Sequence, residues 1–252
     1  MLQRKLHWCM MAVVTGLLLL PCVGAKAANT PQLSADQIVE KNVAARGGLA
    51  AWRNVQTMTM SGQMDAGKGV KLPYVMELKR GRKQRVELQF DGKTAIQVYD
   101  GSNGWKLRPY LGRRQVENYT PDELKRAALE SDIDGPLVDY AAKGIKVEAA
   151  GIEQVEGHDA YVLKLSLKDG QERRLWIDAK TFLEVKIDGW RRMDGKPRPI
   201  ETYYRDYRTV QGLQIPFGYE TAVKGIKGTE KIEIEKVEVN PALADSQFAK
   251  LE

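Results

Sequence analysis

Between Val55 and Asn240, apolar and polar residues alternate with a period of two, which is the pattern of β-strands that bury one face. Short segments rich in Gly, Asp and Asn interrupt this alternation about every ten residues. Parallel strands need crossover connections of about a dozen residues or more, and most of these interruptions are much shorter. The pattern therefore predicts an antiparallel meander of hairpins, broken once in the middle of the chain.

The alternation predicts eleven or twelve strands in two runs. The first run covers residues 56–66, 70–79, 84–90, 94–99 and 104–109, and the second begins at 145 and continues through 161–167, 172–177, 182–193, 197–210, 213–223 and 229–240. In the last strand the apolar phase changes between Ile234 and Val237, which predicts a β-bulge near residues 235–236. Strands this long and numerous form a strongly curved antiparallel sheet or an unclosed β-barrel. We expect a mainly β fold with helices, of the α+β class.

An N-terminal helical region precedes the strands. Ser34 is an N-cap residue, and Gln37 three positions later completes a capping box. The predicted helix ends at Gly47 and Gly48, and a further helical turn is expected after them. The helical region as a whole covers residues 34–53. Its apolar side must be buried, so we expect it to pack on the sheet.

The break between the two runs is a predicted helical insert. Residues 120–123 (TPDE) combine a capping Thr, Pro at the first helical position and Glu at the third, which starts a helix that runs to about Glu130. Residues 134–136 (DGP) predict a second short helix that ends at Gly144. We expect the whole insert, residues 120–144, to cover the open face of the sheet as a lid.

The first 27 residues have the three parts of a secretory signal peptide. Arg4 and Lys5 form a basic start, residues 10–20 are nearly all apolar, and residues 25–27 (AKA) place small side chains at a cleavage site. The apolar run is too short for a membrane-spanning helix. We predict export to the periplasm and a single mature domain over residues 28–252.

Cysteine and histidine are nearly absent from the predicted mature chain. Cys9 and Cys22 both lie in the signal peptide, which excludes disulfides and thiol nucleophiles. Lipidation at Cys22 is the alternative to cleavage, but Pro21 stands where a lipidation signal has Gly, Ala or Ser. His158 is the only mature histidine, in a predicted turn, so neither a catalytic triad nor a histidine metal site is expected. We expect no enzyme, no metal and no cofactor.

Charge argues against a nucleic-acid partner. The signal peptide holds three of the 39 Lys and Arg residues and none of the 33 Asp and Glu residues. The predicted mature chain therefore has a net charge of only +3, and export separates it from nucleic acids.

Methionines are concentrated in the first two predicted strands, at Met58, Met60, Met64 and Met76. Methionine is flexible and polarizable, and it lines surfaces that accept varied apolar shapes. The same residues are also ordinary core fillers. Where helices cover the open face of a curved sheet, the two apolar surfaces either meet as a dry core or leave a ligand cavity. Both interpretations of the methionines remain open.

Several motifs, in a fixed order, resemble the periplasmic lipoprotein-carrier superfamily, the Lol-type (LolA-like) outer-membrane lipoprotein-sorting proteins. They are residues 42–52 (NVAARGGLAAW), 77–80 (ELKR), 84–87 (QRVE), 99–105 (YDGSNGW), 212–216 (GLQIP) and 240–243 (NPAL), followed by Phe248. The order of an export signal, an N-terminal helix, a strand run, a helical insert and a second strand run is also similar. The resemblance spans nearly all of the predicted mature chain.

This resemblance implies an unclosed β-barrel whose concave face, covered by helices, holds the acyl chains of a lipoprotein or another lipid. It implies a monomeric carrier that receives cargo from an inner-membrane donor complex and passes it to an outer-membrane acceptor. In the family, an Arg in a Lys-Arg-Pro stretch contacts the lid and helps to couple opening to transfer. Arg80 is the corresponding residue, although Gly81 replaces the family's Pro.

From strand alternation we choose a set of residues expected to line the cavity. They are Trp52 below the N-terminal helix, then Met58, Met60, Trp105, Leu107, Leu163, Leu165, Val185 and Ile187 on the strands. Two other functions remain open: an envelope-stress sensor of lipids or lipoproteins with the same fold, and a periplasmic hydrolase. Clustered carboxylates in a polar cleft would favour the hydrolase.

Overall fold

The structure, a computed structural model, describes residues 32–67, 69–109, 112–193 and 195–251. The predicted signal peptide and its cleavage site lie outside the described residues. The strands are β1 (Thr57–Asp65), β2 (Lys71–Lys79), β3 (Lys83–Phe90), β4 (Lys93–Tyr99), β5 (Gly104–Arg108), β6 (Arg113–Asn118), β7 (Lys146–Val155), β8 (His158–Ser166), β9 (Glu172–Asp178), β10 (Glu184–Met193), β11 (Lys196–Val210), β12 (Leu213–Val223) and β13 (Thr229–Val239). The helices are α1 (Ala35–Ala45), α2 (Leu49–Asn54), α3 (Pro121–Glu130) and the short 3₁₀ helix η2 (Asp245–Phe248).

One antiparallel sheet contains these 13 strands, in the order β6-β5-β4-β3-β2-β1-β13-β12-β11-β10-β9-β8-β7. Neighbours in the sheet are consecutive in the chain except β1 and β13, whose pairing joins the two runs. The end strands β6 and β7 are not paired with each other, so the sheet is unclosed. The predicted fold class is therefore confirmed, with 13 strands in place of eleven or twelve. Strand β6 was not predicted because Val116 is its only apolar residue.

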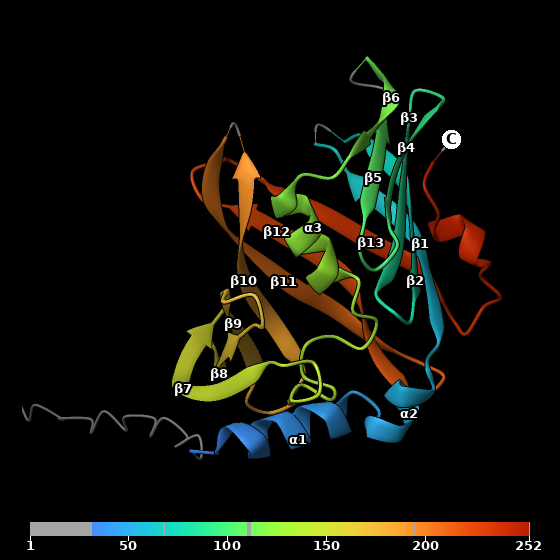
Figure 1. Cartoon of the computed structure of the whole chain (residues 1–252). Coiled ribbons are helices and arrows are strands. Elements are labelled where there is room, and N and C mark those ends of the chain that lie inside the picture. Colours follow the sequence, from blue (N-terminus) through green and yellow to red (C-terminus); the bar gives the residue numbers. More distant parts are fainter. Residues whose placement is uncertain (1–31, 68, 110–111, 194, 252) are drawn as a thin grey trace, which may run out of the picture. The chain divides into compact units, whose positions relative to one another are not determined.

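The sheet curves strongly, and α3 lies on its concave side (Figure 1). We call the side covered by α3 the inner face and the opposite side the outer face. Helices α1 and α2 lie along one end of the sheet, and η2 lies on the outer side next to the strands of the first run (Figure 1).

The predicted bulge in the last strand is present. Ser61 of β1 pairs with Lys236, whereas the next residue, Gly62, pairs with Ile234, so Glu235 has no partner in β1. A Cβ atom at Gly62 would lie 2.0 Å from the carbonyl oxygen of Glu233, and this close approach requires glycine. The bulge keeps Ile234 and Val237 on the same face, which explains the change of apolar phase.

Helix α1 begins and ends where the sequence predicts. The Ser34 Oγ accepts a hydrogen bond from the Gln37 N–H at 3.2 Å, and the Gln37 side chain returns a bond to the Ser34 N–H. Gly47 follows with φ of 115°, and a Cβ there would lie 2.5 Å from the carbonyl oxygen of Gly212. The end of α1 thus packs directly against the turn between β11 and β12.

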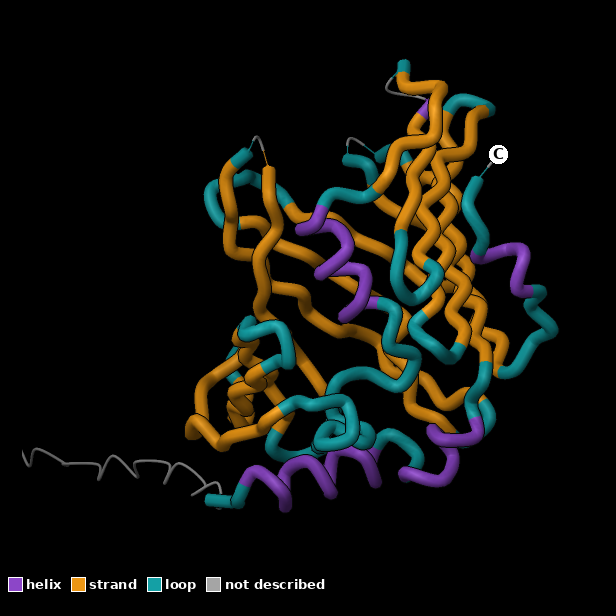
Figure 2. The backbone as a smooth tube through the Cα atoms, in the orientation of Figure 1, coloured by secondary structure: helices purple, strands orange, loops and turns teal. Residues whose placement is uncertain are grey.

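The insert differs from its prediction in the second half. Helix α3 has the predicted capping box, with the Glu123 N–H donating to the Thr120 hydroxyl. Residues 131–144, however, form a series of turns and no second α-helix, as the tube in Figure 2 shows. The prediction of a helix there was wrong because Asp139 has φ of 51°, a left-handed conformation that interrupts a right-handed helix.

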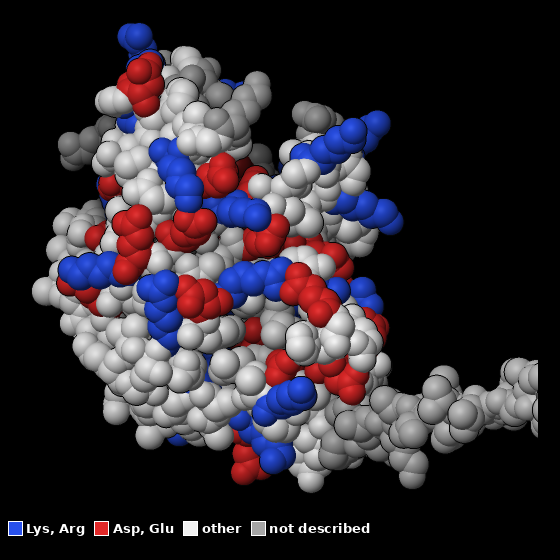
Figure 3. Space-filling model, turned by 180° about the vertical axis from the view of Figure 1, so that it is seen from behind, with Lys and Arg blue, Asp and Glu red and all other residues white. Residues whose placement is uncertain are grey.

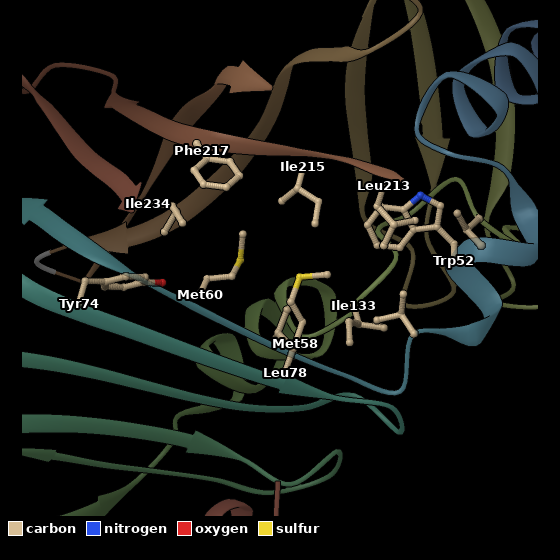
Figure 4. Close-up of a cluster of buried hydrophobic side chains, with 12 residues drawn as sticks. Trp52, Met58, Met60, Tyr74, Leu78, Ile133, Leu213, Ile215, Phe217 and Ile234 are labelled. Atoms are coloured by element: carbon tan, nitrogen blue, oxygen red, sulfur yellow. The ribbon is translucent and has the colours of Figure 1, made fainter. Parts of the chain in front are cut away.

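Two separate apolar clusters fill the inner side. The methionine cluster contains Trp52, Val55, Met58, Met60, Tyr74, Leu78, Ile133, Val138, Leu213, Ile215, Phe217 and Ile234 (Figure 4). The leucine cluster contains Ile38, Val39, Leu137, Ile145, Tyr161, Leu163, Leu165, Leu175 and Ile177. The insert packs into both, through Ile133 in the first cluster and Leu137 in the second.

Candidate functional site

Strand pairing decides which side chains share the inner face with α3. Lys106 of β5 marks this face, because its Nζ binds the Glu123 carboxylate of α3 at 2.6 Å. Directly paired residues of an antiparallel sheet point to the same face. Lys106 pairs with Gln97 of β4, and Gln97 pairs with Val86 of β3. Val86 pairs with Met76 of β2, which pairs with Met60 of β1. Met60, and Met58 two residues earlier, therefore lie on the inner face as predicted.

Trp105 and Leu107 lie on the outer face, which corrects their predicted position. Each is a neighbour of Lys106 in β5, so its side chain points the opposite way. They pair with Val98 and Ile96 of β4, not with the row that leads to the methionines. Alternation correctly grouped Trp105 with Leu107, but it could not say which face of β5 turns inward.

The inner face around the methionine cluster is apolar but incompletely covered. Met58 and Met60 are each 2% exposed. Their neighbours on the same face remain partly exposed to solvent, namely Met64, Met76, Val86, Leu88, Tyr219 and Ile232. Burial raises the pKa of Tyr74, whose hydroxyl lies 3.5 Å from the Met76 sulfur. This part of the sheet thus presents flexible apolar side chains, with few polar groups, on the face that α3 covers.

The leucine cluster is sealed. Leu163 and Leu165 of β8 are 0% and 1% exposed, and Ile38 of α1 packs against the same cluster. Ile187 of β10 lies at the edge of this cluster and is partly buried. These residues do lie on the inner side of the sheet, as predicted, but α1 covers them.

Val185 and Ile187 were expected to share a face, and the structure places them on opposite faces. The pairing of β10 with β9 shifts between Glu184 and Lys186, which leaves Val185 at a bulge. Val185 packs against a third cluster that contains Trp176, whereas Ile187 packs against the leucine cluster. An irregularity of this kind breaks the period of two on which the expectation rested.

Trp52 joins the helical end of the molecule to the methionine cluster. It is 2% exposed, and its indole Nε1 donates to the carbonyl oxygen of Arg46 at 3.0 Å. The Arg46 guanidinium lies 4.4 Å from the centre of the Trp52 ring. Trp52 thus belongs to α2, and its side chain is buried in the methionine cluster.

Arg80 contacts the insert directly. Its Nη1 donates to the Asp134 carboxylate at 2.8 Å, its Nε donates to the carbonyl oxygen of Val55 at 2.6 Å, and its Nη2 donates to that of Trp52. One guanidinium therefore joins the turn between β2 and β3, the end of α2 and the insert. Gly81 follows with φ of 87°, so the turn uses a left-handed glycine where the family pattern has Pro.

A buried charged network surrounds Asp134, which is 2% exposed. Besides Arg80, Lys143 binds its carboxylate at 2.5 Å. Burial acts to raise the pKa of Asp134, but hydrogen bonds from Lys143 and Arg80 outweigh it and hold the pKa below its usual value. Burial raises the pKa of neighbouring Asp132 to about 6, with Lys143 opposing the rise. This network anchors residues 131–144 to the sheet.

Arg46 and Glu184 extend this network toward the centre of the sheet. Arg46 Nη1 lies 3.5 Å from a Glu184 carboxylate oxygen and donates to the carbonyl oxygen of Asp134 at 2.9 Å. Sequence reasoning missed both residues. Arg46 stands within the motif of residues 42–52, but Glu184 lies 138 positions away in the chain and belongs to no motif, so only the fold brings the two together.

Helix α3 is attached to both walls of the curved sheet. Glu123 binds Lys106 of β5, and Asp122 binds the Arg192 Nε of β10 at 2.6 Å. The first pair is partly buried and the second is exposed. The helix thus bridges the concave side through ion pairs at its N-terminal end.

The outer face carries charges of both signs (Figure 3). Ion pairs on it include Lys71–Glu233, Lys231–Glu220 and Arg205–Glu156. A pocket of about 720 Å³ lies where β12 and β13 separate beyond the pair Gly218–Glu233. Phe217 and Ile234 of the methionine cluster form part of its wall. The volume is in the range of small-molecule sites.

His158 is exposed at the start of β8, directly after a turn formed by Glu156 and Gly157. Among the described residues, no group of three or more His, Cys, Asp or Glu side chains is placed to hold a metal ion. Nor is any helix in the described part of the chain long and apolar enough to cross a membrane.

Comparison with known proteins identifies the fold. No family model matches the sequence, and no curated protein matches it. A solved structure of a LolA superfamily protein from Nitrosomonas europaea is 15% identical, with TM-score 0.56, and the match covers 87% of this chain and 99% of that one. A DUF1329 family protein from Desulfovibrio piger is 13% identical, with TM-score 0.58, over 85% and 97%.

A domain from Vibrio parahaemolyticus described as an outer-membrane lipoprotein-sorting protein is also similar. It is 12% identical with TM-score 0.55, and the match covers 84% of this chain and 94% of that one. These matches extend over nearly the whole length of each solved chain. The protein therefore has a LolA-like fold, which confirms the expected resemblance at the level of the fold.

Proposed function

We propose that the protein binds acyl chains of a lipid or lipoprotein on its inner face and carries them through the periplasm. One observation carries this proposal: Met64, Met76, Val86 and Leu88 remain partly exposed on the face that α3 covers. Burying a methylene group contributes about 0.8 kcal/mol, so a long acyl chain on this surface gains substantial free energy. The LolA-like fold and the lipoprotein-sorting description of one similar structure support the same class of cargo.

The insert acts as the cover in this proposal. Helix α3 is attached through the pairs Lys106–Glu123 and Arg192–Asp122, which involve side chains only. Residues 131–144 are anchored more firmly, because Asp134 is buried between Arg80 and Lys143. We therefore propose that α3 lifts while residues 131–144 stay in place, and that Arg80 couples this movement to the sheet.

A matched pair of variants on β2 tests the proposal. Met76 and Val75 are adjacent and both partly exposed, but they point to opposite faces. In the mature protein, Met76→Glu should weaken binding of a fluorescent long-chain fatty acid by about tenfold or more, since it places a carboxylate beside the chain. Val75→Glu adds the same charge to the outer face and should leave binding within about twofold of wild type.

Fluorescence titration of both variants, with circular dichroism to confirm folding, gives the result. Equal loss of binding in the two folded variants would contradict an inner-face site. Mass spectrometry of lipids that co-purify from the periplasm would then identify the cargo of the wild-type protein.

A further inference from the structure

Three arginines meet on the inner face near the hairpin that joins β10 to β11. Arg173 of β9 pairs with Leu165 and so lies on the face of the leucine cluster. Arg191 of β10 lies on the same face, four residues after Ile187. Arg198 of β11 pairs directly with Arg191. We call these three residues the arginine corner.

The direct pair of Arg191 and Arg198 is unfavourable in a sheet, because like charges opposite each other repel. Arg191 has one partner, the Glu230 carboxylate at 2.7 Å from its Nη1. Arg198 has no hydrogen bond or ion pair within the described part of the chain. The arrangement leaves positive charge on the inner face that the neighbouring strands do not balance.

Arg173 is the most buried member, at 6% exposed. Its Nη2 donates to the Gln171 side chain at 2.9 Å, but its Nη1 is buried and has no partner in the structure. The Nε atoms of Arg191 and Arg198 are likewise buried without a partner. Buried donors without acceptors are costly, so they mark a place where an acceptor binds.

Glu130, at the end of α3, is the acidic group that faces the corner from the insert. Its carboxylate contacts Arg126 at 3.7 Å and makes no ion pair with the corner. Arg173 and Arg198 make no ion pair with Glu130 or with any other carboxylate in the described part of the chain.

The corner continues into the apolar surface along β11 and β12. Arg198, Thr202 and Tyr204 lie on the inner face of β11 in this order. The Thr202 hydroxyl lies 3.0 Å from that of Thr221. Tyr204 packs edge-on against Tyr219, which borders the methionine cluster. Six residues of strand span about 20 Å, so charge, hydroxyl and apolar surface follow one another over the length of one lipid.

We infer that the arginine corner binds the phosphate-bearing headgroup of an amphiphile whose acyl chain lies on the methionine surface. This inference rests on the proposed function and names its ligand class. Guanidinium groups bind phosphate oxygens with two parallel hydrogen bonds, and the unpaired donors of the corner supply them. A bound phosphate also separates the charges of Arg191 and Arg198.

Two lipids that differ only in the phosphate test the inference: oleoyl lysophosphatidic acid and monooleoylglycerol. Wild-type protein should bind the phosphate lipid at least about tenfold more tightly, as expected for charged hydrogen bonds. Arg173→Gln and Arg198→Gln should each lose this preference and keep their affinity for monooleoylglycerol. Arg174→Gln, which changes an outer-face arginine of the same strand, should retain the preference.

Calorimetric titration, with thermal melts to confirm folding of each variant, separates the outcomes. Equal binding of the two lipids by the wild type overturns the headgroup inference but leaves the proposed function intact. Failure of both lipids to bind overturns the proposed function itself. Inorganic phosphate that binds without any lipid preference, and is lost in Arg173→Gln, would show a free-phosphate site and also overturn the inference.

Discussion

The methionine and leucine clusters arise from the same sequence pattern but are covered differently. Both use alternate residues of long strands, and both lie on the inner side of the sheet. Leu163 and Leu165 are sealed by α1, whereas Met76 and Leu88, beside the methionine cluster, remain partly exposed below α3. The difference teaches that a helix whose apolar side chains enter the cluster makes a core, whereas a helix attached by ion pairs leaves apolar surface available.

The largest expected effect on stability comes from placing a carboxylate in or beside each cluster. Leu165→Glu should destabilise the protein by about 4 kcal/mol or more, or prevent folding, because its carboxylate has no route to water. Met76→Glu should cost less than about 2 kcal/mol, because its site is partly exposed. Urea denaturation measures both. Similar costs for the two variants would show that the clusters are equally sealed.

The next effect concerns residues 131–144, which lie between the clusters. Asp134→Ala removes the buried partner of Arg80 and Lys143 and should cost about 3 kcal/mol or more. Arg53→Ala breaks an exposed ion pair with Asp139 of the same segment and should cost less than about 1 kcal/mol. Equal stabilities of the two variants in chemical denaturation would show that the Asp134 network does not anchor the insert.

A change of pH should alter the contribution of residues 131–144 to stability but not that of the apolar clusters, which contain no Asp or Glu. The folded state raises the pKa of Asp132 to about 6, so it binds the proton more tightly than the unfolded state does. The contribution of Asp132 to stability therefore falls as the pH rises from about 4 to about 6, and stays low above that. Asp134, with its lowered pKa, acts in the opposite direction and loses its contribution only as the solution becomes more acidic.

Asp132→Asn should thus flatten the fall in stability between pH 4 and 6, by an amount of the order of 1 kcal/mol. Thermal denaturation across this pH range measures it, with wild type as the reference. An unchanged pH profile would indicate that Lys143 fully compensates the burial of Asp132.

The smallest effect is expected outside both clusters. His158→Ala changes an exposed side chain at the start of β8 and should alter stability by less than about 0.5 kcal/mol, with no change in fatty-acid binding. A complete loss of function in cells by a folded His158→Ala protein would revive the hydrolase hypothesis.

Local signals in the sequence predicted most of the elements. Capping boxes at Ser34 and Thr120 located the starts of α1 and α3, and the change of phase after Ile234 located the bulge in β13. These features depend on residues close together in the chain, so the sequence alone determines them. Strand β6 escaped prediction because a strand with one apolar residue has no periodic signal.

The same reasoning located only part of the candidate site. Met58, Met60 and Trp52 lie where they were expected, and Arg80 contacts the insert. Trp105 points outward, since alternation defines two faces of a strand without saying which one is covered.

Only the tertiary structure decided which apolar residues are sealed and which charges meet. Arg46, Glu184 and Asp134 come from α1, β10 and the insert, and the arginine corner comes from three strands. No local pattern encodes such encounters, because curvature of the sheet and the docking of helices set the distances between residues far apart in the chain. The sequence by itself determined the strands, their turns and their caps. The covering of each face, and with it the difference between core and ligand surface, is a property of how those elements pack.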